Sequence, residues 1–411
     1  MNEEKLIPHL FRTEYRKIVA VLCKTFGMQH IELAEDIASD TFLRATELWS
    51  IKGIPDNPNA WLYTVAKNKA RNYLKRDKIL SEKIIPQLKF SHAILEETEI
   101  DLSEQNIKDS QLQMIFAICH PSITAEAQIA LALRILCGFS IEEIASAFLT
   151  NKETINKRLF RAKEKLRLKK IEITLPSPIE IDARLDMVLR TLYLLYNEGY
   201  YTSQRKNILA KELCHEAMRL TYLLIENEPT NLPNVSALLA LMSFHASRFE
   251  ARINEKGEFI LYDDQDETLW DKDLIRQGEY FLQQSSEGNQ FSKYHLEAGI
   301  AYWHTHKEDT KEKWENILRL YNELLILEYS PVVAMNRTFA LSKANNVEEA
   351  IDQAEKLKLT QNHLYYTLLG QLYKEKDVHK AAACFIEALR LAKTPEDKRL
   401  IQGKIDKLGF H

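Results

Sequence analysis

Apolar residues recur at intervals of three and four along most of the chain, which is the spacing of an amphipathic α-helix. Within residues 31–49 the apolar positions are Ile31, Ala34, Ile37, Ala38, Thr41, Phe42, Ala45 and Leu48. The same spacing predicts further helices over 15–26, 60–75, 125–137, 141–148 and 153–169. The chain holds only 11 glycines and 11 prolines in 411 residues, which argues against sandwiches, barrels and glycine-built nucleotide sites. We therefore expect an all-α protein.

Helix-breaking residues divide this pattern into domains. Gly53, Pro55 and Pro58 form a loop inside the first domain, and Pro176 and Pro178 follow the last basic helix. The predicted parts are a domain over 5–78, a linker over 79–119 with one or two helical pieces, a domain over 120–170, and a helical extension over 180–411 with candidate subdomains 180–300 and 310–411. Within the extension, the segment 252–273 is expected to form a loop or short hairpin.

The C-terminal quarter of the chain contains a weak internal repeat. Ala350, Ala354 and Leu357 recur 31 positions later as Ala381, Phe385 and Ala388, and Gly370 and Tyr373 precede the second copy. This pattern predicts stacked helical hairpins resembling tetratricopeptide repeats, although the helix pair is about one residue short for that geometry. Earlier in the extension, Gly199 is interpreted as the residue that ends a helix, with a signal-responsive turn over 197–199 as the alternative.

The charge of the chain is unevenly distributed. The net charge is −4, which by itself argues against a nucleic-acid partner. Residues 1–175, however, hold 26 basic and 23 acidic residues, whereas the remainder holds 29 and 36. Two segments are locally cationic, with six basic residues and one acidic residue in 61–78, and nine and two in 151–170. These segments are the candidates for nucleic-acid contact.

Residues 141–169 have the pattern of a helix-turn-helix whose second helix is basic. Ser140 and Glu143 predict a capping box at the start of the first helix. The second helix carries an apolar stripe, and the candidate contacts to duplex DNA are Lys152, Thr154, Asn156, Lys157, Arg158, Arg161 and Lys165. In a recognition helix the N-terminal turn reaches base edges while later cations contact phosphates. The alternative is a solvated basic face without a nucleic-acid partner.

Residues 60–78 interleave basic side chains with aromatic rings and amides, a mixture that suits single-stranded nucleic acid. Rings stack on unpaired bases and cations follow the backbone, and a pocket for a flipped base stabilises an opened duplex. The candidate contacts are Trp61, Tyr63, Lys67, Asn68, Arg71, Asn72, Lys75 and Arg76. For Trp61 the competing interpretation is an ordinary core residue. Trp61 can be both a core residue and a contact to the base if the edge of its ring borders the base pocket.

A third element lies before these two. Asp36 and Asp40 are four residues apart, so both carboxylates share one face of the predicted helix 31–49. Like charges at this spacing are mildly destabilising, and a basic partner surface would compensate for that cost. Two solvated acids are the alternative interpretation.

These three elements, in this order, resemble the extracytoplasmic-function group of the sigma-70 family of bacterial RNA polymerase sigma factors. Residues 34–45 resemble the region 2.2 helix, 57–72 resemble regions 2.3 and 2.4, and 140–145 with 153–163 resemble the region 4 helix-turn-helix. The resemblance implies that Asp36, Ser39, Asp40 and Thr41 bind the beta-prime clamp helices of core RNA polymerase, with the beta flap as a further partner. It also implies that segment 60–78 melts and reads the −10 element and that helix 153–169 reads the −35 element.

Residues 192–201 and 330–337 look like hallmark segments of long sigma factors with a tetratricopeptide-like extension. In that subgroup the extension is thought to control the sigma factor in cis, which implies contact between the extension and the sigma domains. The acidic charge of the extension suggests that it packs on the basic DNA-binding surfaces when the factor is idle. Asp40 stands where the family usually has Glu, and the turn 149–152 lacks the usual glycine, so docking geometry and −35 preference do not transfer in detail.

The function implied is promoter-specific transcription initiation, without enzymatic activity, cofactor or metal. The histidine pair His304 and His306 is expected at the surface with its rings apart, and the five cysteines form no C-x-x-C pair. The N-terminus lacks a signal-peptide core and no apolar run reaches 18 residues, so we expect a cytoplasmic protein without membrane contact. Two alternatives remain: a helix-turn-helix transcriptional regulator with a ligand- or protein-sensing helical domain that does not bind core polymerase, and a peptide-binding scaffold.

Overall fold

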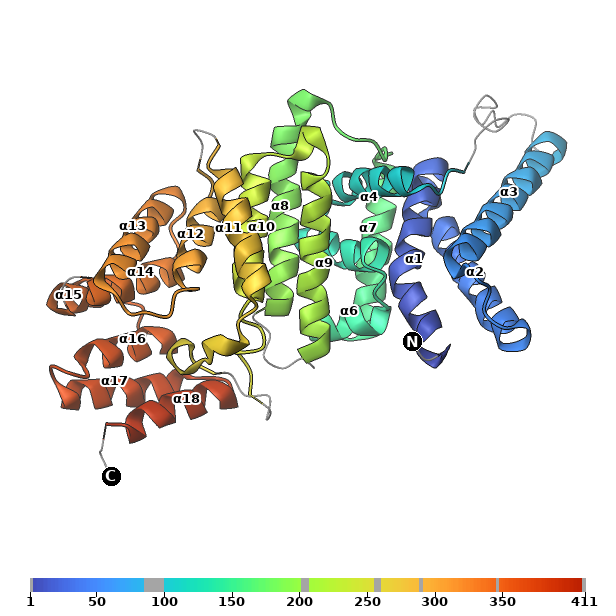
Figure 1. Cartoon of the computed structure of the whole chain (residues 1–411). Coiled ribbons are helices and arrows are strands. Elements are labelled where there is room, and N and C mark those ends of the chain that lie inside the picture. The colour runs from blue at the N-terminus through green and yellow to red at the C-terminus, as the bar shows by residue number, and fades with distance from the viewer. Residues whose placement is uncertain are drawn as a thin grey trace. The chain divides into compact units, whose positions relative to one another are not determined.

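A computed structural model describes residues 3–84, 100–200, 207–254, 260–287, 291–344 and 347–408 (Figure 1). Within these ranges every regular element is a helix, as the hydrophobic spacing predicts. The chain forms two compact units, Met1–Asn231 (unit 1) and Leu232–His411 (unit 2). None of the described helices combines the length and apolar character that crossing a membrane requires.

Unit 1 begins with three packed helices, α1 (Glu3–Phe26), α2 (Ile31–Lys52) and α3 (Pro58–Ile84). The predicted apolar stripe of α2 is buried, apart from the half-buried Leu48. Gly53 ends α2 at φ +81°, and its N–H donates to the carbonyl of Trp49. The Asn57 side chain then accepts the N–H of Ala60 at 3.0 Å and caps α3. Local sequence signals therefore determine where these helices begin and end.

The next part of unit 1 consists of α4 (Glu104–Ile118), α5 (Ala125–Leu131), the π-helix η2 (Ala132–Leu136), α6 (Ile141–Ala147) and α7 (Lys152–Leu168). The capping box of Ser140 and Glu143 is present, as predicted. The expected single helix over 125–137 is instead α-helix followed by π-helix, because the N–H of Cys137 reaches the carbonyl of Ala132. The helix α4 lies in the second half of the predicted linker and packs on α1.

Two long helices from the extension complete unit 1. They are α8 (Pro178–Tyr200) and α9 (Asn207–Ile225), which lie side by side (Figure 1) and pack on α4, with α8 also contacting α5. The interpretation of Gly199 as a helix end is wrong, because this glycine lies inside the last turn of α8. A Cβ there would come within 2.5 Å of the Ala210 carbonyl oxygen, so Gly199 permits close packing of α8 on α9.

The boundary between the units, at Asn231, falls inside the candidate subdomain 180–300. The reason is burial: α8 and α9 cover their apolar faces against each other and against the helices of the 104–136 segment. The first part of the extension is therefore structurally part of the same unit as the two cationic segments.

Unit 2 is a succession of helices in which chain neighbours pack together. They are α10 (Pro233–Ala246), α11 (Lys272–Ser285), α12 (Lys293–Trp303), α13 (Lys311–Leu327), α14 (Pro331–Ala344), α15 (Val347–Leu357), α16 (His363–Tyr373), α17 (Val378–Leu391) and α18 (Pro395–Asp406), with short 3-10 turns η4 (Tyr262–Asp264) and η5 (Glu267–Leu269). The repeat positions Ala350, Ala354, Ala381, Phe385 and Ala388 are buried. Gly370 lies against the ring of Phe385, where a Cβ would be 2.7 Å from ring carbons.

The histidine pair of unit 2 differs from its expected placement. His306 is exposed, but His304, at the end of α12, is packed against the rings of Tyr262 and Trp314. Burial, with Arg248 and Lys313 nearby, lowers the pKa of His304 to about 3. The prediction that both rings lie at the surface is therefore wrong for His304, because the loop carrying Tyr262 covers it.

Candidate nucleic-acid and polymerase interface

The basic helix α7 has the two faces that its sequence predicts. Ile155, Leu159, Ala162 and Leu166 are buried. Of the candidate duplex contacts, Lys152, Thr154, Asn156, Lys157, Arg161 and Lys165 are exposed and Arg158 is half-buried. The side chains of Lys157, Arg161 and Lys165 form no hydrogen bond or ion pair with any residue that the structure describes. This row of cations is therefore available to phosphates.

Two candidate residues of α7 are instead engaged with α6 and the turn after it. The Lys152 ammonium pairs with the Glu142 carboxylate. The Arg158 guanidinium lies over the ring of Phe148, 4.8 Å from its centre, a cation–π contact. Both residues therefore also contact the first helix of the helix-turn-helix or the turn that follows it.

The aromatic residues at the start of α3 are half-buried rather than fully exposed. Trp61 packs edge-on against Trp49 with ring centres 5.3 Å apart. The Tyr63 hydroxyl donates to the Glu14 carboxylate, and burial together with this hydrogen bond raises the pKa of Tyr63. Tyr63 thus holds α3 on α1, which leaves its hydroxyl engaged within the protein.

The second half of the α3 candidate set is open to solvent. Asn68, Arg71, Asn72, Lys75 and Arg76 are exposed, and Lys67 is half-buried. Because these residues follow one another at helical spacing after the aromatic turn, they form a polar and cationic surface on α3.

The helix α2 presents three of its four candidate polymerase contacts. Asp36, Ser39 and Asp40 are exposed, and Asp40 pairs with Lys69 of α3 at 3.2 Å. Thr41 is fully buried, and its hydroxyl donates to the Ile37 carbonyl at 2.7 Å. Thr41 cannot touch a partner with its side chain, because it belongs to the apolar stripe of α2.

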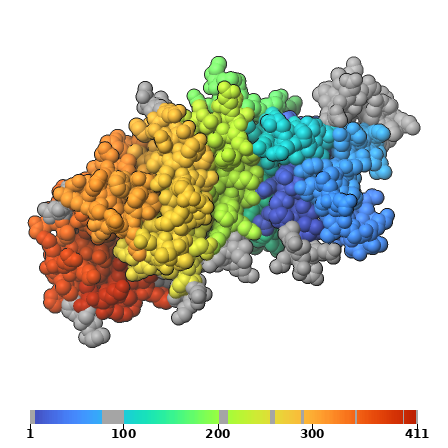
Figure 2. Space-filling view, in the orientation of Figure 1, coloured from blue at the N-terminus to red at the C-terminus, as the bar shows by residue number. Residues whose placement is uncertain are grey.

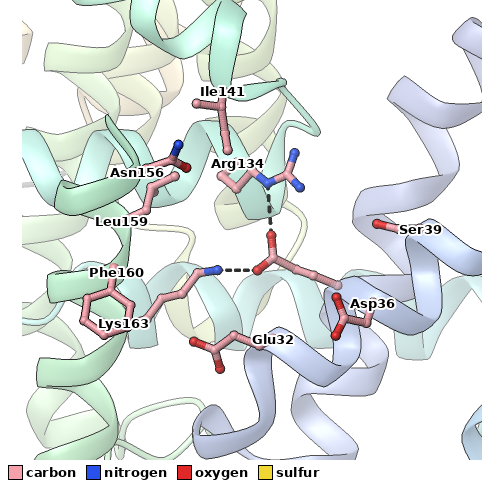
Figure 3. A pocket seen from close by; sticks show the side chains of 10 residues that line it. Glu32, Asp36, Ser39, Arg134, Ile141, Asn156, Leu159, Phe160 and Lys163 are labelled. Atoms are coloured by element: carbon pink, nitrogen blue, oxygen red, sulfur yellow. Dashed lines mark hydrogen bonds and ion pairs between the residues drawn. The ribbon is translucent and has the colours of Figure 1, made fainter. Parts of the chain in front are cut away.

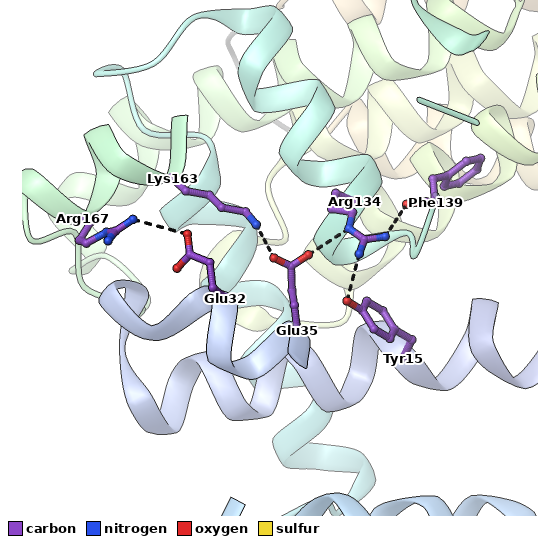
Figure 4. Close-up of polar contacts among 7 residues, drawn as sticks. All are labelled: Tyr15, Glu32, Glu35, Arg134, Phe139, Lys163 and Arg167. Atoms are coloured by element: carbon purple, nitrogen blue, oxygen red, sulfur yellow. Dashed lines mark hydrogen bonds and ion pairs between the residues drawn. The ribbon is translucent and has the colours of Figure 1, made fainter. Parts of the chain in front are cut away.

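The most prominent polar feature of unit 1 joins α2 to the 125–168 segment (Figure 4). We call Glu32, Glu35, Arg134, Lys163 and Arg167 the interdomain cluster. The Glu35 carboxylate accepts the Arg134 Nε–H at 2.9 Å and also pairs with the Lys163 ammonium. Glu32 and Arg167 approach within 3.5 Å. The two acids belong to α2, in the helix bundle that carries the first cationic segment (the first module). The three bases belong to the 125–168 segment, which carries the second cationic segment (the second module). The cluster therefore joins the two modules.

Arg134 owes its position to the π-helix. Besides Glu35, its guanidinium donates to the Phe139 carbonyl at 3.2 Å and to the Tyr15 hydroxyl at 3.4 Å. The side chains of Glu35, Lys163 and Arg134 are only 10%, 12% and 19% exposed. Interactions among such shielded charges are screened by water and salt much less than surface pairs.

A cavity of about 290 Å³ lies beside this cluster (Figure 3). Asp36 and Ser39 line it from α2, and Asn156, Phe160 and Lys163 line it from α7. Two candidate polymerase contacts and one candidate duplex contact therefore line the same open cavity. The helix α7 thus borders the face of α2 that is expected to contact polymerase.

Sequence reasoning missed the cluster, although one signal pointed to it. Glu35 lies between Ala34 and Ala38 in the apolar stripe of α2. A carboxylate in a buried stripe requires a cationic partner. The partner itself is more than 90 residues away in the chain, so the spacing of charges could not identify it.

The extension contacts both modules through α8 and α9. Arg12 of α1 pairs with Glu143 of α6 and with Glu212 of α9. Arg16 of α1 pairs with Glu216 of α9. Burial alone would raise the pKa of the Glu216 carboxyl, but Arg219 and Arg16 outweigh it and hold this pKa below its usual value. The carboxylate is therefore charged at neutral pH and attracts both arginines.

Further contacts of the extension reach the linker helix α4 and the 125–136 segment of the second module. Arg219 donates to the Leu136 carbonyl at 2.8 Å, and Arg184 donates to the Phe116 carbonyl at 2.6 Å. The buried Thr191 hydroxyl donates to Gln128 at 2.8 Å. Within unit 1, Glu212 and Glu216 of α9 thus pair with Arg12 and Arg16, and Glu226, directly after α9, pairs with Lys108. These partners lie on α1 and α4, and the expected packing of the extension on the DNA-contacting cations stays a prediction.

Comparison with protein families matches three parts of the chain. Residues 10–79 match sigma-70 region 2, and residues 119–166 match sigma-70 region 4. Residues 184–286 match a family of unknown function, DUF6596. The two cationic modules are thus the two matched sigma-70 regions, and the third match begins inside α8.

Two relatives cover different lengths of the chain. An uncharacterized protein of Rhizobium meliloti (strain 1021), R00370, is 31% identical over 93% of this chain and 91% of its own length. The RNA polymerase sigma factor YlaC of Bacillus subtilis (strain 168) is 30% identical over 41% of this chain and 93% of its own length. No solved structure matches the chain.

Proposed function

Because the chain belongs to the sigma-70 family of RNA polymerase sigma factors, we propose that it binds core RNA polymerase, directs promoter-specific initiation and is held inactive by its own extension. The family consists of transcription factors rather than enzymes. The observation that carries the proposal is the interdomain cluster, which joins the helix predicted to bind polymerase to the helix predicted to read the −35 element.

Core binding rests on the surface of α2. Asp36, Ser39 and Asp40 present two carboxylates and a hydroxyl to solvent, and this surface suits the basic beta-prime clamp helices that the family binds. Asp40 is paired with Lys69, so docking would exchange this exposed pair for one with the partner at little cost.

Promoter binding would require unit 1 to open. The −10 and −35 elements are separated by roughly 60 Å, or 17–18 base pairs of about 3.4 Å each. In the closed arrangement the Lys163 ammonium touches the Glu35 carboxylate, so regions 2 and 4 are in direct contact. Simultaneous contact with both elements is incompatible with that distance. Opening would break the cluster and release α7 to the −35 duplex.

The extension supports the closed form by contacting both regions. Arg12 bridges α6 and α9, while Arg16, Arg184 and Arg219 add contacts from α1, α8 and α9. If these contacts were removed, the interdomain cluster alone would have to hold the two regions together. The extension therefore acts on the sigma domains by stabilising their mutual packing, and the DNA-contacting side chains of α7 stay exposed.

The decisive experiment is transcription in vitro with sigma-free core polymerase and a promoter library. The full-length chain is compared with Glu212→Gln/Glu216→Gln, which removes two carboxylates of α9 without changing either sigma region. Asp182→Asn, an exposed residue of α8, is the matched control. We expect the double variant to increase promoter-directed transcription several-fold and the control to leave it unchanged.

The remaining outcomes separate the alternatives. Lower transcription by the double variant would mean that the extension supports activity instead of restraining it. Sequence-specific duplex binding without co-purification with core polymerase would identify a helix-turn-helix regulator, and the proposal of core binding would then be wrong.

A further inference from the structure

A second cavity, of about 480 Å³, lies within unit 2 between the η4 segment and the last three helices. The η4 segment contributes Asp263 and Asp264, Lys374 lies directly after α16, and α18 contributes Lys404, with Lys407 directly after it. In Figure 1 the yellow η4 loop lies beside α16 and α18, and in Figure 2 its yellow surface borders the red surface of the last helices. A volume of this size is typical of small-molecule sites.

Four of the charged groups that line this cavity are not paired with one another, while the Lys404 ammonium donates to the Gln371 side-chain oxygen at 3.5 Å. Among the residues that the structure describes, the side chains of Asp263, Asp264, Lys374 and Lys407 form no hydrogen bond or ion pair. The cavity therefore has a cationic wall and an acidic wall that face a shared space. A ligand with an anionic group at one end and a hydrogen-bond donor at the other would complement both walls.

The acidic wall, formed by Asp263 and Asp264, follows Tyr262 in the chain, and contacts of Tyr262 hold this segment in place. Its hydroxyl donates to the His306 carbonyl at 3.1 Å and accepts from the Lys313 ammonium at 3.1 Å. The Arg248 guanidinium lies 5.4 Å from the centre of its ring. Because Tyr262 is fixed on this side, the two following aspartates are positioned at the cavity without needing a ligand to order them.

The cationic wall concentrates positive charge. Burial, together with Lys407 and Lys374, lowers the pKa of Lys404, while Asp263 and Asp264 act in the opposite direction. An anion bound at this wall would therefore relieve repulsion between neighbouring ammonium groups.

Gly403 leaves open space at the edge of the cavity. It lies inside α18, has an ordinary helical φ, and a Cβ there would meet no atom within 4 Å apart from its chain neighbours and the backbone of its own helix. Glycine costs helix stability relative to alanine, and neither packing nor backbone geometry explains it here. Since Gly403 lines the cavity, a side chain at this position would point into the space that a ligand would fill.

We propose that this cavity binds a small organic anion with hydrogen-bond donors at its opposite end. A carboxylate or phosphate group contacts Lys374, Lys404 and Lys407, and an ammonium or hydroxyl group contacts Asp263 and Asp264. The buried ring of Phe385 forms an apolar part of the lining between the two walls. An acidic dipeptide and a nucleoside monophosphate both have this chemistry.

Isothermal titration of the full-length chain with matched probes tests the proposal. Aspartyl-phenylalanine is compared with its N-acetylated form, which lacks the ammonium group, and adenosine monophosphate is compared with adenosine, which lacks the phosphate. We expect one of the two anions to bind, at least tenfold more tightly than its matched partner. The pair that shows the difference identifies the source of the ligand.

Variants then locate the binding site. Lys404→Gln/Lys407→Gln and Asp263→Asn/Asp264→Asn should each weaken binding at least tenfold, while Lys393→Gln, an exposed control outside the lining, should not. Gly403→Ala should weaken binding and raise the thermal midpoint, a combination that a purely structural glycine would not give. Binding of neither anion below millimolar concentration, or binding that both double variants leave intact, would overturn the proposal.

Discussion

Glu35 offers the sharpest test of the closed arrangement. It is the central carboxylate of the interdomain cluster, and Glu35→Gln keeps its shape while removing its charge. Both of its cationic partners, Arg134 and Lys163, come from the region 4 segment, whereas Glu35 comes from region 2. The loss therefore falls on the contact between the two regions, and the stripe of α2 retains its packing.

The size of the effect follows from burial. Removing one partner of a buried ion pair costs about 3–5 kcal/mol, because the remaining charge is left without compensation. The Glu35 side chain is 10% exposed, but the adjacent cavity gives Lys163 and Arg134 access to water. We therefore take the lower end, about 3 kcal/mol. At 1.36 kcal/mol for each factor of ten, this raises the ratio of open to closed molecules roughly 150-fold.

Two measurements read this ratio. Equilibrium binding to sigma-free core polymerase should tighten by up to roughly 150-fold while the closed form dominates, because apparent affinity scales with the open fraction. Hydrogen exchange at the backbone of α7 should accelerate in the same variant. Glu47→Gln makes the same change in charge on the same helix, at an exposed position, and should alter neither measurement.

A cross-link supplies the opposite perturbation. Ser39 and Phe160 line one cavity from opposite helices, so cysteines at both positions, joined by a short bismaleimide, should lock the closed form. The experiment needs a Cys384→Ser background, because Cys384 is half-buried while the other native cysteines are buried. Unchanged core affinity in Glu35→Gln, or full affinity in the cross-linked protein, would refute the reasoning that closure blocks α2.

Three further predictions concern stability and DNA binding. Gly199→Ala should destabilise unit 1 by about 1–3 kcal/mol in chemical denaturation, because its Cβ would lie 2.5 Å from the Ala210 carbonyl oxygen. Folded His304 has a pKa of about 3 and stays neutral, whereas the unfolded residue takes up a proton near its ordinary pKa of 6.5. Its contribution to stability is complete above pH ~6.5 and falls by about 2 kcal/mol at pH 5, a loss that His304→Phe should remove from the thermal unfolding of unit 2. Arg161→Ala should lower the slope of log affinity against log salt by about 1 in duplex binding, since it deletes one phosphate contact.

Features that depend on neighbouring residues were predictable from the sequence. The buried stripe of α2 and the capping box at Ser140 each depend on residues a few positions apart, and the structure contains both. The exposed row of cations on α7 follows from the same logic, because a helix with one apolar stripe must present its other face.

Features that depend on distant segments were not predictable. Gly199 was interpreted as a helix end because glycine is common there, but its role is contact with α9. Thr41 matched a family motif, yet its place in the apolar stripe buries it. The interdomain cluster requires Glu35 to meet Lys163, and no local pattern encodes a pairing across 128 positions. The sequence shows only that Glu35 places a carboxylate in the apolar stripe of α2. This indicates that a cationic partner exists, but it does not identify the partner.

Two different pairs of acids on α2 would determine the closed fraction of the protein and its affinity for core polymerase, so the two quantities can be changed separately. Glu32 and Glu35 pair with α7, whereas Asp36 and Asp40 face solvent on the next positions of the helix. Under the proposed mechanism, changes in the first pair alter the open fraction and changes in the second alter intrinsic affinity for core polymerase. In the part of unit 1 that the structure describes, α8 and α9 pack on α4 and pair with α1 rather than with these four acids. Under the proposed mechanism, a partner of the extension would control transcription through its differential affinity for the open and closed forms, and each 1.4 kcal/mol of that difference would change the ratio of the two forms tenfold.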